Sequence, residues 1–111
     1  MRQELGIDIV KNSRIKINYN FLIKFLTKTE LKMMENFTSK KRKKEFAAGR
    51  WAAKEAIFKV LKTTKKINLN EIELGYDNNK LLIKNKNLSN IVVSLSHEKK
   101  YSIAIASWIG D

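Results

Sequence analysis

The sequence contains no cysteine and no proline, and it has one histidine and four glycines among its 111 residues. Without cysteine the chain has no disulfide framework, no thiol nucleophile and no thiolate metal site. No apolar run approaches the roughly 18 residues of a membrane span, and the opening stretch is too mixed to be a signal peptide. We therefore expect a globular protein that stays in the cytoplasm, where it is made.

No proline-rich or glycine-rich linker, repeat or low-complexity tract divides the chain. Domains most often contain about 100–150 residues, and two domains would leave each half with too small a core. The hydrophobic fraction of 43%, with five phenylalanines, three tyrosines and two tryptophans, is sufficient for a core and excludes a disordered chain. We expect residues 1–111 to form a single domain.

Acidic residues are scarce, with eleven against 23 basic residues, which gives a formal net charge of +12. This charge favours anionic partners such as nucleic acid, phosphorylated small molecules, acidic proteins or anionic membranes. Nineteen of the basic residues are lysines, and asparagine outnumbers glutamine by eleven to one, a bias that fits an AT-rich coding sequence. Charge alone therefore does not identify the partner.

Alternation with a period of two residues predicts a strand over residues 5–10. Ile7 and Ile9 share one face of this strand, and Asp8 lies on the other. A carboxylate within an apolar strand is expensive to desolvate unless it is paired or binds a cation. Asp8 is thus a candidate metal ligand, and the alternative is a carboxylate on a wet face or paired with a lysine.

Helical spacing begins at Tyr19, and Thr29-Glu30 predicts the cap of a second short helix. The strongest helical pattern covers residues 39–62, where Ser39 can cap the first turn. Strands are predicted at residues 71–76, 81–84, 91–96 and 101–108, with turns at 77–79 and 97–100.

The last strand is apolar on both faces, so we expect it to be central or to lie at a subunit interface. One strand, then helices that include a long central helix, then an antiparallel meander make an α+β fold.

The long helix carries the second candidate site. Arg50 and Lys54 are four residues apart and share one face, with Glu55 beside them. Gly49 in a helix interior is unfavourable by about 1 kcal/mol relative to alanine unless close packing requires it. The alternative is packing alone, with Glu55 paired to Lys59.

The third candidate is His97, which follows Ser94 and Ser96 at a strand end and could bind a ligand or transfer a proton. A serine hydrolase triad is excluded, because no G-x-S-x-G motif is present and adjacent residues on a strand end point in opposite directions. A solvated turn histidine remains the alternative.

Three motifs in register, GIDIV at 6–10, F-x-x-G-R-W-A-A-K-E-A at 46–56 and V-S-L-S-H-E at 93–98, resemble the holo-acyl-carrier-protein synthase family. The resemblance spans essentially the whole chain. It implies a 4'-phosphopantetheinyl transferase-like fold and a homotrimer with active sites at subunit boundaries. It also implies transfer of phosphopantetheine from coenzyme A to a serine of apo acyl carrier protein, with release of adenosine 3',5'-bisphosphate, in fatty acid biosynthesis.

By this resemblance Asp8 and Glu55 match the two acids that bind Mg²⁺, a cation that takes one or two carboxylates beside waters and phosphates. The serine proton could go to Glu55, a metal-bound water or His97, and the sequence leaves these alternatives open. The residues matched to coenzyme A contacts are Arg42, Phe46, Arg50, Lys54, Lys59 and His97.

The sequence departs from the family pattern after the long helix, where it reads LKTTKK in place of a glycine-rich turn, and at Phe58, where a small polar residue is expected. Carrier proteins are small and acidic, so basic residues near the first helix are expected to form a docking face, with a merely solvated basic face as the alternative. The expected docking residues are Lys11, Arg14, Lys16, Lys24 and Lys28.

Two other functions compete with this interpretation. A nucleic-acid-binding module is favoured by the charge but predicts exposed aromatics on one sheet face, whereas most aromatics here have core-like spacing. A non-catalytic relative that binds coenzyme A or carrier protein is disfavoured because both Asp8 and Glu55 are present.

Overall fold

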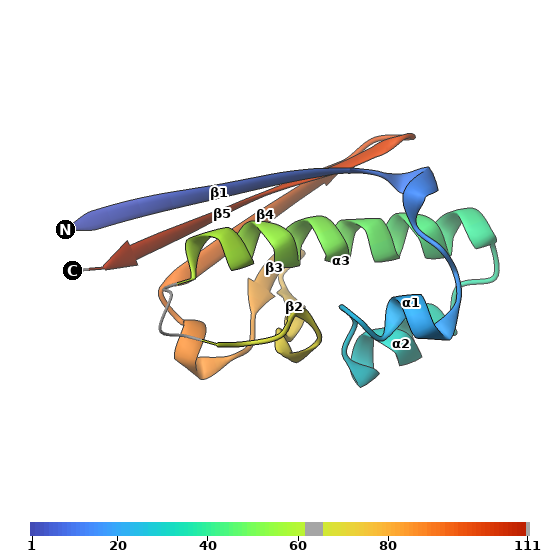
Figure 1. Ribbon diagram of the computed structural model, residues 1–111, viewed down its shortest axis with the longest axis horizontal. Helices are drawn as coiled ribbons and strands as arrows, with labels where there is room; N and C mark the ends of the chain where they lie inside the picture. The colour runs from blue at the N-terminus through green and yellow to red at the C-terminus, as the bar shows by residue number, and fades with distance from the viewer. Residues whose placement is uncertain (62–65, 111) are drawn as a thin grey trace.

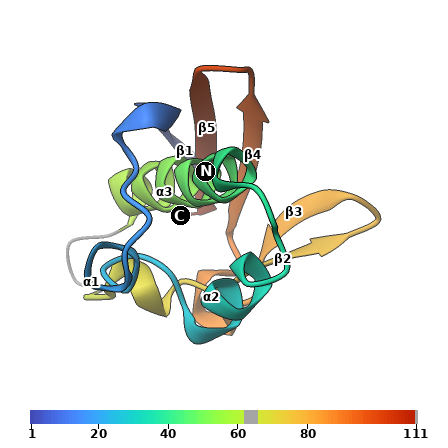
Figure 2. The same cartoon turned by 90° about the vertical axis from the view of Figure 1, so that its right-hand side faces the viewer.

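The computed structural model describes residues 1–61 and 66–110, which form layers on either side of one long helix, α3 (Lys40–Val60) (Figure 1). A three-stranded sheet covers one side of α3. The helices α1 (Tyr19–Leu22) and α2 (Lys28–Met34) and a two-stranded hairpin lie on the other side (Figure 2). The sheet contains β1 (Arg2–Lys11), β4 (Ile91–His97) and β5 (Tyr101–Gly110), and the hairpin contains β2 (Leu74–Asp77) and β3 (Lys80–Ile83).

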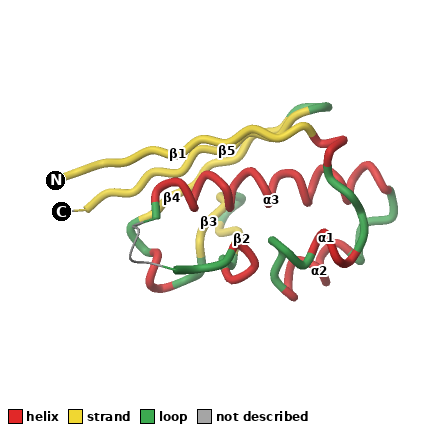
Figure 3. Tube along the Cα trace, viewed as in Figure 1, coloured by secondary structure: helices red, strands yellow, loops and turns green. Residues whose placement is uncertain are grey.

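The larger sheet has the order β1-β5-β4, with both pairs antiparallel. The sequence prediction that the last strand is central is therefore confirmed, as is the α+β class. The predicted antiparallel meander is interrupted, because β2 and β3 pair only with each other in a separate sheet. Figure 3 shows the hairpin apart from the three long strands.

The predicted turn of the hairpin is confirmed at Asn78 and Asn79, whose φ angles of 49° and 68° lie in the left-handed region. Asparagine tolerates this region better than most residues. Strand β2 begins at Leu74, three residues later than predicted, because residues 69–71 form a 3-10 turn.

Helix α3 begins where the sequence predicted, and the Ser39 hydroxyl accepts a hydrogen bond from the Arg42 amide at 3.0 Å. The cap of α2 was predicted two residues too late, at Thr29. Thr27 accepts from the Glu30 amide and the Glu30 carboxylate accepts from the Thr27 amide, so the S/T-x-x-E capping box starts at Thr27.

Alanine side chains form the surface of α3 that packs into the core. Small side chains allow neighbouring backbones to approach closely, and Ala104 and Ala106 of β5 are buried as well. The buried alanines of α3 are Ala47, Ala48, Ala52, Ala53 and Ala56.

The two faces of β1 differ in burial. Asp8 and Val10 share the face toward α3, whereas Ile7 and Ile9 are 57% and 60% exposed on the other face. The apolar outer face continues onto β5, because Ile7 lies opposite Ile105 and Ile9 opposite Ile103. The strand thus exposes its branched apolar residues in the isolated subunit.

None of the helices in the described parts of the chain is long and apolar enough to cross a membrane. Most of the LKTTKK segment that follows α3, residues 62–65, lies outside the described residues.

Candidate functional site

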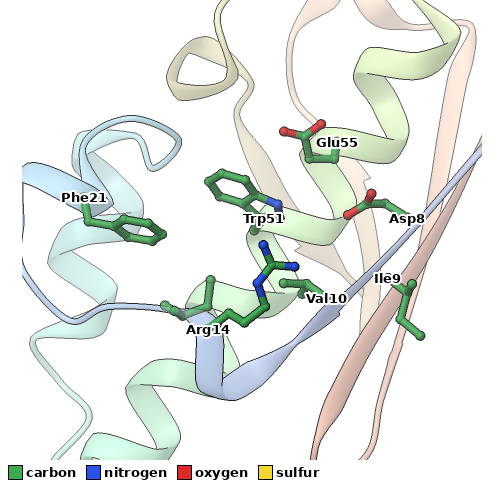
Figure 4. Close-up of a pocket in the computed structure, with 8 residues that line it drawn as sticks. Asp8, Ile9, Val10, Arg14, Phe21, Trp51 and Glu55 are labelled. Carbon is green, nitrogen blue, oxygen red and sulfur yellow. The ribbon is translucent and has the colours of Figure 1, made fainter.

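Asp8 of β1 and Glu55 of α3 line one cavity of about 370 Å³ (Figure 4). Gly6 allows β1 to come this close to α3, because a Cβ atom at Gly6 would lie 2.3 Å from the carbonyl oxygen of Ala56. Asp8 is two residues further along the same face of β1, and Glu55 immediately precedes Ala56. The close approach at Gly6 therefore brings the two carboxylates to one site.

The surroundings of Glu55 show that the two acids interact. Burial, and then the charge of Asp8, raise the pKa of the Glu55 carboxyl above its ordinary value, while Lys59 opposes the shift. No cluster of three or more metal-ligating side chains occurs within residues 1–61 and 66–110. Two carboxylates that face an open cavity nevertheless suit Mg²⁺, which completes its octahedron with waters and substrate phosphates.

Lys59, one turn beyond Glu55, lies beside these acids. Its ammonium group donates a 2.6 Å hydrogen bond to the Ile7 carbonyl and lies 3.3 Å from Asp8 Oδ1. The expected alternative of a lysine pair for Asp8 is thus present in the structure. Because the Lys59 side chain is about half exposed, the same cation is also accessible from solvent.

We expect Glu55→Gln to stabilise the metal-free protein at neutral pH. The raised pKa means that the folded chain binds more protons than the unfolded chain above pH 4.5, so wild-type stability falls as pH rises through that window. The neutral amide removes this loss. Urea unfolding with a chelator should show a stability difference that vanishes below the ordinary carboxyl pKa, and a difference independent of pH would contradict the prediction.

The opposite wall of the cavity is aromatic and carries one cation. The ring of Trp51 lies parallel to that of Phe21 at 6.0 Å and meets that of Phe25 edge-on at 4.8 Å. Figure 4 shows the Arg14 guanidinium pointing into the cavity beside Trp51. Sequence reasoning missed Phe21 and Trp51 as wall residues, although Trp51 and Glu55 are four apart and share a helix stripe.

A second stripe of α3 carries the residues matched to coenzyme A. The guanidinium of Arg50 lies 4.6 Å from the centre of the Phe46 ring, and that of Arg42 lies 4.8 Å from the Phe37 ring. Arg50 also donates to the Tyr76 hydroxyl at 3.4 Å. Its Nη2 is buried without a hydrogen-bond partner among the described residues.

Lys54 occupies a different environment from the one that the sequence suggested. Its ammonium group is fully buried and contacts Glu30 Oε1 at 2.5 Å and the Phe25 carbonyl at 2.7 Å. A phosphate in the acid cavity cannot contact this ammonium group, because Lys54 is fully buried and does not line the cavity. The structure therefore gives no support to a phosphate contact for Lys54.

His97 lies at the end of β4 beside Gly49 of α3. A Cβ at Gly49 would lie 3.1 Å from the imidazole Cε1, so the glycine makes room for the ring. His97 Nδ1 is 3.3 Å from the Ser102 hydroxyl, which in turn donates to Asn12 at 2.8 Å. The serine that hydrogen-bonds His97 is thus Ser102 and not the adjacent residue Ser96. Antiparallel pairing of β4 with β5 places Ser102 opposite His97.

The predicted docking residues are all exposed. Arg14 alone among them lines the acid cavity. Lys11 ends β1, and Lys24 and Lys28 flank the link between α1 and α2. These residues and the exposed Lys16 are close to Phe21 in the sequence, which is compatible with the predicted docking face.

One subunit does not bring all predicted site residues together. The acid cavity is lined by Asp8 and Glu55, whereas His97 lines a separate cavity of about 480 Å³ with Tyr76 and Lys80. No residue lines both cavities. The chain thus has two half-sites, one acidic with an aromatic wall and one basic beside the hairpin.

Curated relatives and solved structures match this chain over nearly its full length. Proteins described as holo-[acyl-carrier-protein] synthase from Mycoplasma capricolum and Mycoplasma mycoides are 50% and 52% identical to it, each over 96% of this chain and 94% of theirs. A crystal structure of a holo-(acyl-carrier-protein) synthase from Bacillus anthracis in complex with CoA (3',5'-ADP) has a TM-score of 0.81 and 30% identity, covering 94% of this chain and 93% of its own.

A Helicobacter pylori holo-[acyl-carrier-protein] synthase structure in complex with coenzyme A has a TM-score of 0.74 and 26% identity, covering 93% of this chain and 97% of its own. The sequence profile of the 4'-phosphopantetheinyl transferase superfamily matches residues 4–106, which include all three motifs. With this match and relatives at half identity over almost the whole chain, the protein belongs to the 4'-phosphopantetheinyl transferase superfamily.

Proposed function

We propose that this protein is a holo-[acyl-carrier-protein] synthase, which transfers phosphopantetheine from coenzyme A to a serine of apo acyl carrier protein. The observation that carries the proposal is the cavity lined by both Asp8 and Glu55, with the Lys59 ammonium group 3.3 Å from Asp8 Oδ1. Two carboxylates with a neighbouring cation suit phosphoryl transfer, where charge on the transferred group must be offset. The names of the relatives support the same reaction.

Asp8 and Glu55 are proposed to hold Mg²⁺, which when bound would offset the charge of the pyrophosphate of coenzyme A. Lys59 is proposed to meet the phosphates as a point charge, since its ammonium group lies beside Asp8 and its side chain is half exposed. Glu55 is a candidate base for the serine proton, because its raised pKa brings it closer to neutral pH. His97, in the other half-site, is a second candidate.

The second half-site is proposed to bind the nucleotide part of coenzyme A. Arg42, Phe46 and Arg50 lie one helical turn apart, and Arg50 keeps a buried donor that no described residue uses. Arginine suits phosphate because its planar fork makes two parallel hydrogen bonds. His97 and Lys80 lie at the neighbouring cavity.

Because the half-sites are separate in one subunit, we propose a homotrimer in which the acids of one chain meet the nucleotide-binding residues of the next. The outer sheet face supports this assembly, since a contiguous apolar surface of this kind is rare on monomers. The exposed apolar residues of that face are Leu5, Ile7, Ile9, Val92, Tyr101, Ile103, Ile105 and Ile109.

The test is mass spectrometry of apo acyl carrier protein incubated with this protein, coenzyme A and Mg²⁺. A mass gain of one phosphopantetheine supports the proposal, and a carrier protein without its acceptor serine is the control. The protein would instead be assigned as a nucleic-acid-binding module if several carrier proteins gained no mass while nucleic acid bound tightly and with salt dependence.

Charge reversal of Arg14 together with Lys24 should raise the KM for carrier protein by about tenfold, since the two cations are proposed to attract an acidic partner. The salt dependence of this KM should weaken, because there is less attraction to screen. The KM for coenzyme A should rise less than the KM for carrier protein, although Arg14 also lines the acid cavity. Steady-state kinetics at several salt concentrations measures both constants, and an equal rise in both would rule out a separate docking face.

A further inference from the structure

A buried group of three charges joins α2 to α3, and of its members only Arg50 belongs to the proposed nucleotide half-site. The Glu30 carboxylate is fully buried, 2.5 Å from Lys54 Nζ and 2.7 Å from Arg50 Nε. Glu30 also accepts the hydrogen bond of the Thr27 amide that caps α2. Each carboxylate oxygen therefore faces a cation of α3, and one of them also completes the cap.

Lys54 extends this connection to the end of α1. Its ammonium group donates to the backbone carbonyl of Phe25 at 2.7 Å, in addition to its contact with Glu30. A single side chain of α3 thus contacts both the link between α1 and α2, at Phe25, and α2 itself, at Glu30. Its pKa is lowered by burial, and the negative charge of Glu30 opposes that shift.

The held segment carries one wall of the acid cavity. The Phe25 ring packs edge-on against Trp51, and Phe21 lies parallel to the same ring. Trp51 is three residues before Lys54, so the aromatic contacts and the charged contacts lie on adjacent turns of α3. Helix α1 has only four residues and cannot be stable by itself, so these tertiary contacts must fix its position.

We propose that Glu30 and Lys54 are positioning residues that hold the α1–α2 segment in the orientation required for carrier-protein docking. The inference rests on the proposed function for its partner, because the segment also carries Lys24 and Lys28 of the proposed docking face. Lys54 then acts through the segment and contacts no phosphate. Its loss should impair recognition of the carrier protein and leave coenzyme A binding intact.

Lys54→Met tests this proposal, because methionine has a similar length and no ammonium group, while Glu30 keeps Arg50 and the Thr27 amide. We expect the KM for apo acyl carrier protein to rise by about tenfold, since small misplacements of positioning groups have effects of this size or larger. The KM for coenzyme A and kcat should change less than twofold. Amide hydrogen exchange should become faster in residues 18–34 and stay unchanged in β5.

Leu88→Ala is the matched control, because Leu88 is fully buried but lines neither cavity. It should lower the unfolding midpoint without the rise in KM for carrier protein. Glu30→Gln is the second variant, which keeps an oxygen for the Thr27 amide and should also speed exchange in residues 18–34. If Lys54→Met does not fold, the hydrogen exchange of Glu30→Gln and its KM for carrier protein test the proposal, and its KM for coenzyme A is left out because Glu30 also pairs with Arg50.

The proposal is overturned if Lys54→Met raises the KM for coenzyme A alone, which would make Lys54 a phosphate contact. It is also overturned if exchange in residues 18–34 matches that of wild type, or if Leu88→Ala raises the KM for carrier protein equally. A wild-type protein without transferase activity would refute the proposed function alone. Hydrogen exchange would then decide whether the connection holds the segment.

Discussion

Replacement of Asp8 by Asn or of Glu55 by Gln should lower kcat for phosphopantetheine transfer by at least about a hundredfold. Each change keeps the side-chain volume and removes a charged oxygen ligand. A metal that stabilises transition-state charge contributes several kcal/mol, and each 1.4 kcal/mol corresponds to about a tenfold change in rate. Turnover across a Mg²⁺ titration, with both substrates saturating at the highest metal concentration, measures the effect.

Folding provides the control for this prediction. Both variants should retain a cooperative unfolding transition in the absence of metal, and Glu55→Gln should gain stability because the neutral amide removes the cost of burying the Glu55 charge and its repulsion by Asp8. Two variants with wild-type turnover and wild-type metal dependence would remove Asp8 and Glu55 from the site. Loss of activity together with loss of the unfolding transition would show a folding role in place of a ligand role.

Ile103→Lys or Ile105→Lys should convert an active trimer into a folded, inactive monomer. Both side chains are about two-fifths exposed on the outer sheet face, at 38% and 43%, so lysine fits the isolated subunit without entering its core. In the proposed trimer the same ammonium group would be buried in three symmetry-related copies. The desolvation penalty of a buried ion is several kcal/mol even after relaxation, and each 1.4 kcal/mol weakens association about tenfold.

Sedimentation equilibrium combined with the transfer assay tests this prediction. Tyr19→Lys is the matched control, because Tyr19 is 69% exposed and lies on α1, away from the sheet face. It should leave the trimer intact. An Ile103→Lys protein that is trimeric, or a wild-type protein that is monomeric and active throughout the assay range, would contradict the assembly.

Local patterns determined much of the architecture. The strand around Asp8, the long helix that begins after Ser39 and the turn at Asn78-Asn79 were predicted, because each depends on residues close together in the sequence. The central position of β5 was one of the two alternatives predicted, because that strand is apolar on both faces. The three motifs in register indicated the family before any contact was known.

Pairing between distant segments was beyond such patterns. Nothing local distinguishes a continuous meander from the separate β2–β3 sheet, because the choice depends on which long-range contacts bury the most apolar surface. Nor could alternation in β1 indicate which face meets α3. Ile7 and Ile9 lie on the exposed face, because Gly6 allows the other face to approach Ala56 at the distance that brings Asp8 to Glu55.

The roles of the charged residues on α3 show the same division. Helical periodicity alone placed Arg50, Lys54 and Glu55 near one another, and the sequence could treat all three as ligand-binding groups. Burial distinguishes Lys54 from Glu55, since the Lys54 ammonium group is paired with Glu30 inside the core. The sequence by itself thus determined the family, the helix and the pair of acids. Only the tertiary structure separated solvent-facing charges from buried ones, because desolvation depends on neighbours that no local pattern contains.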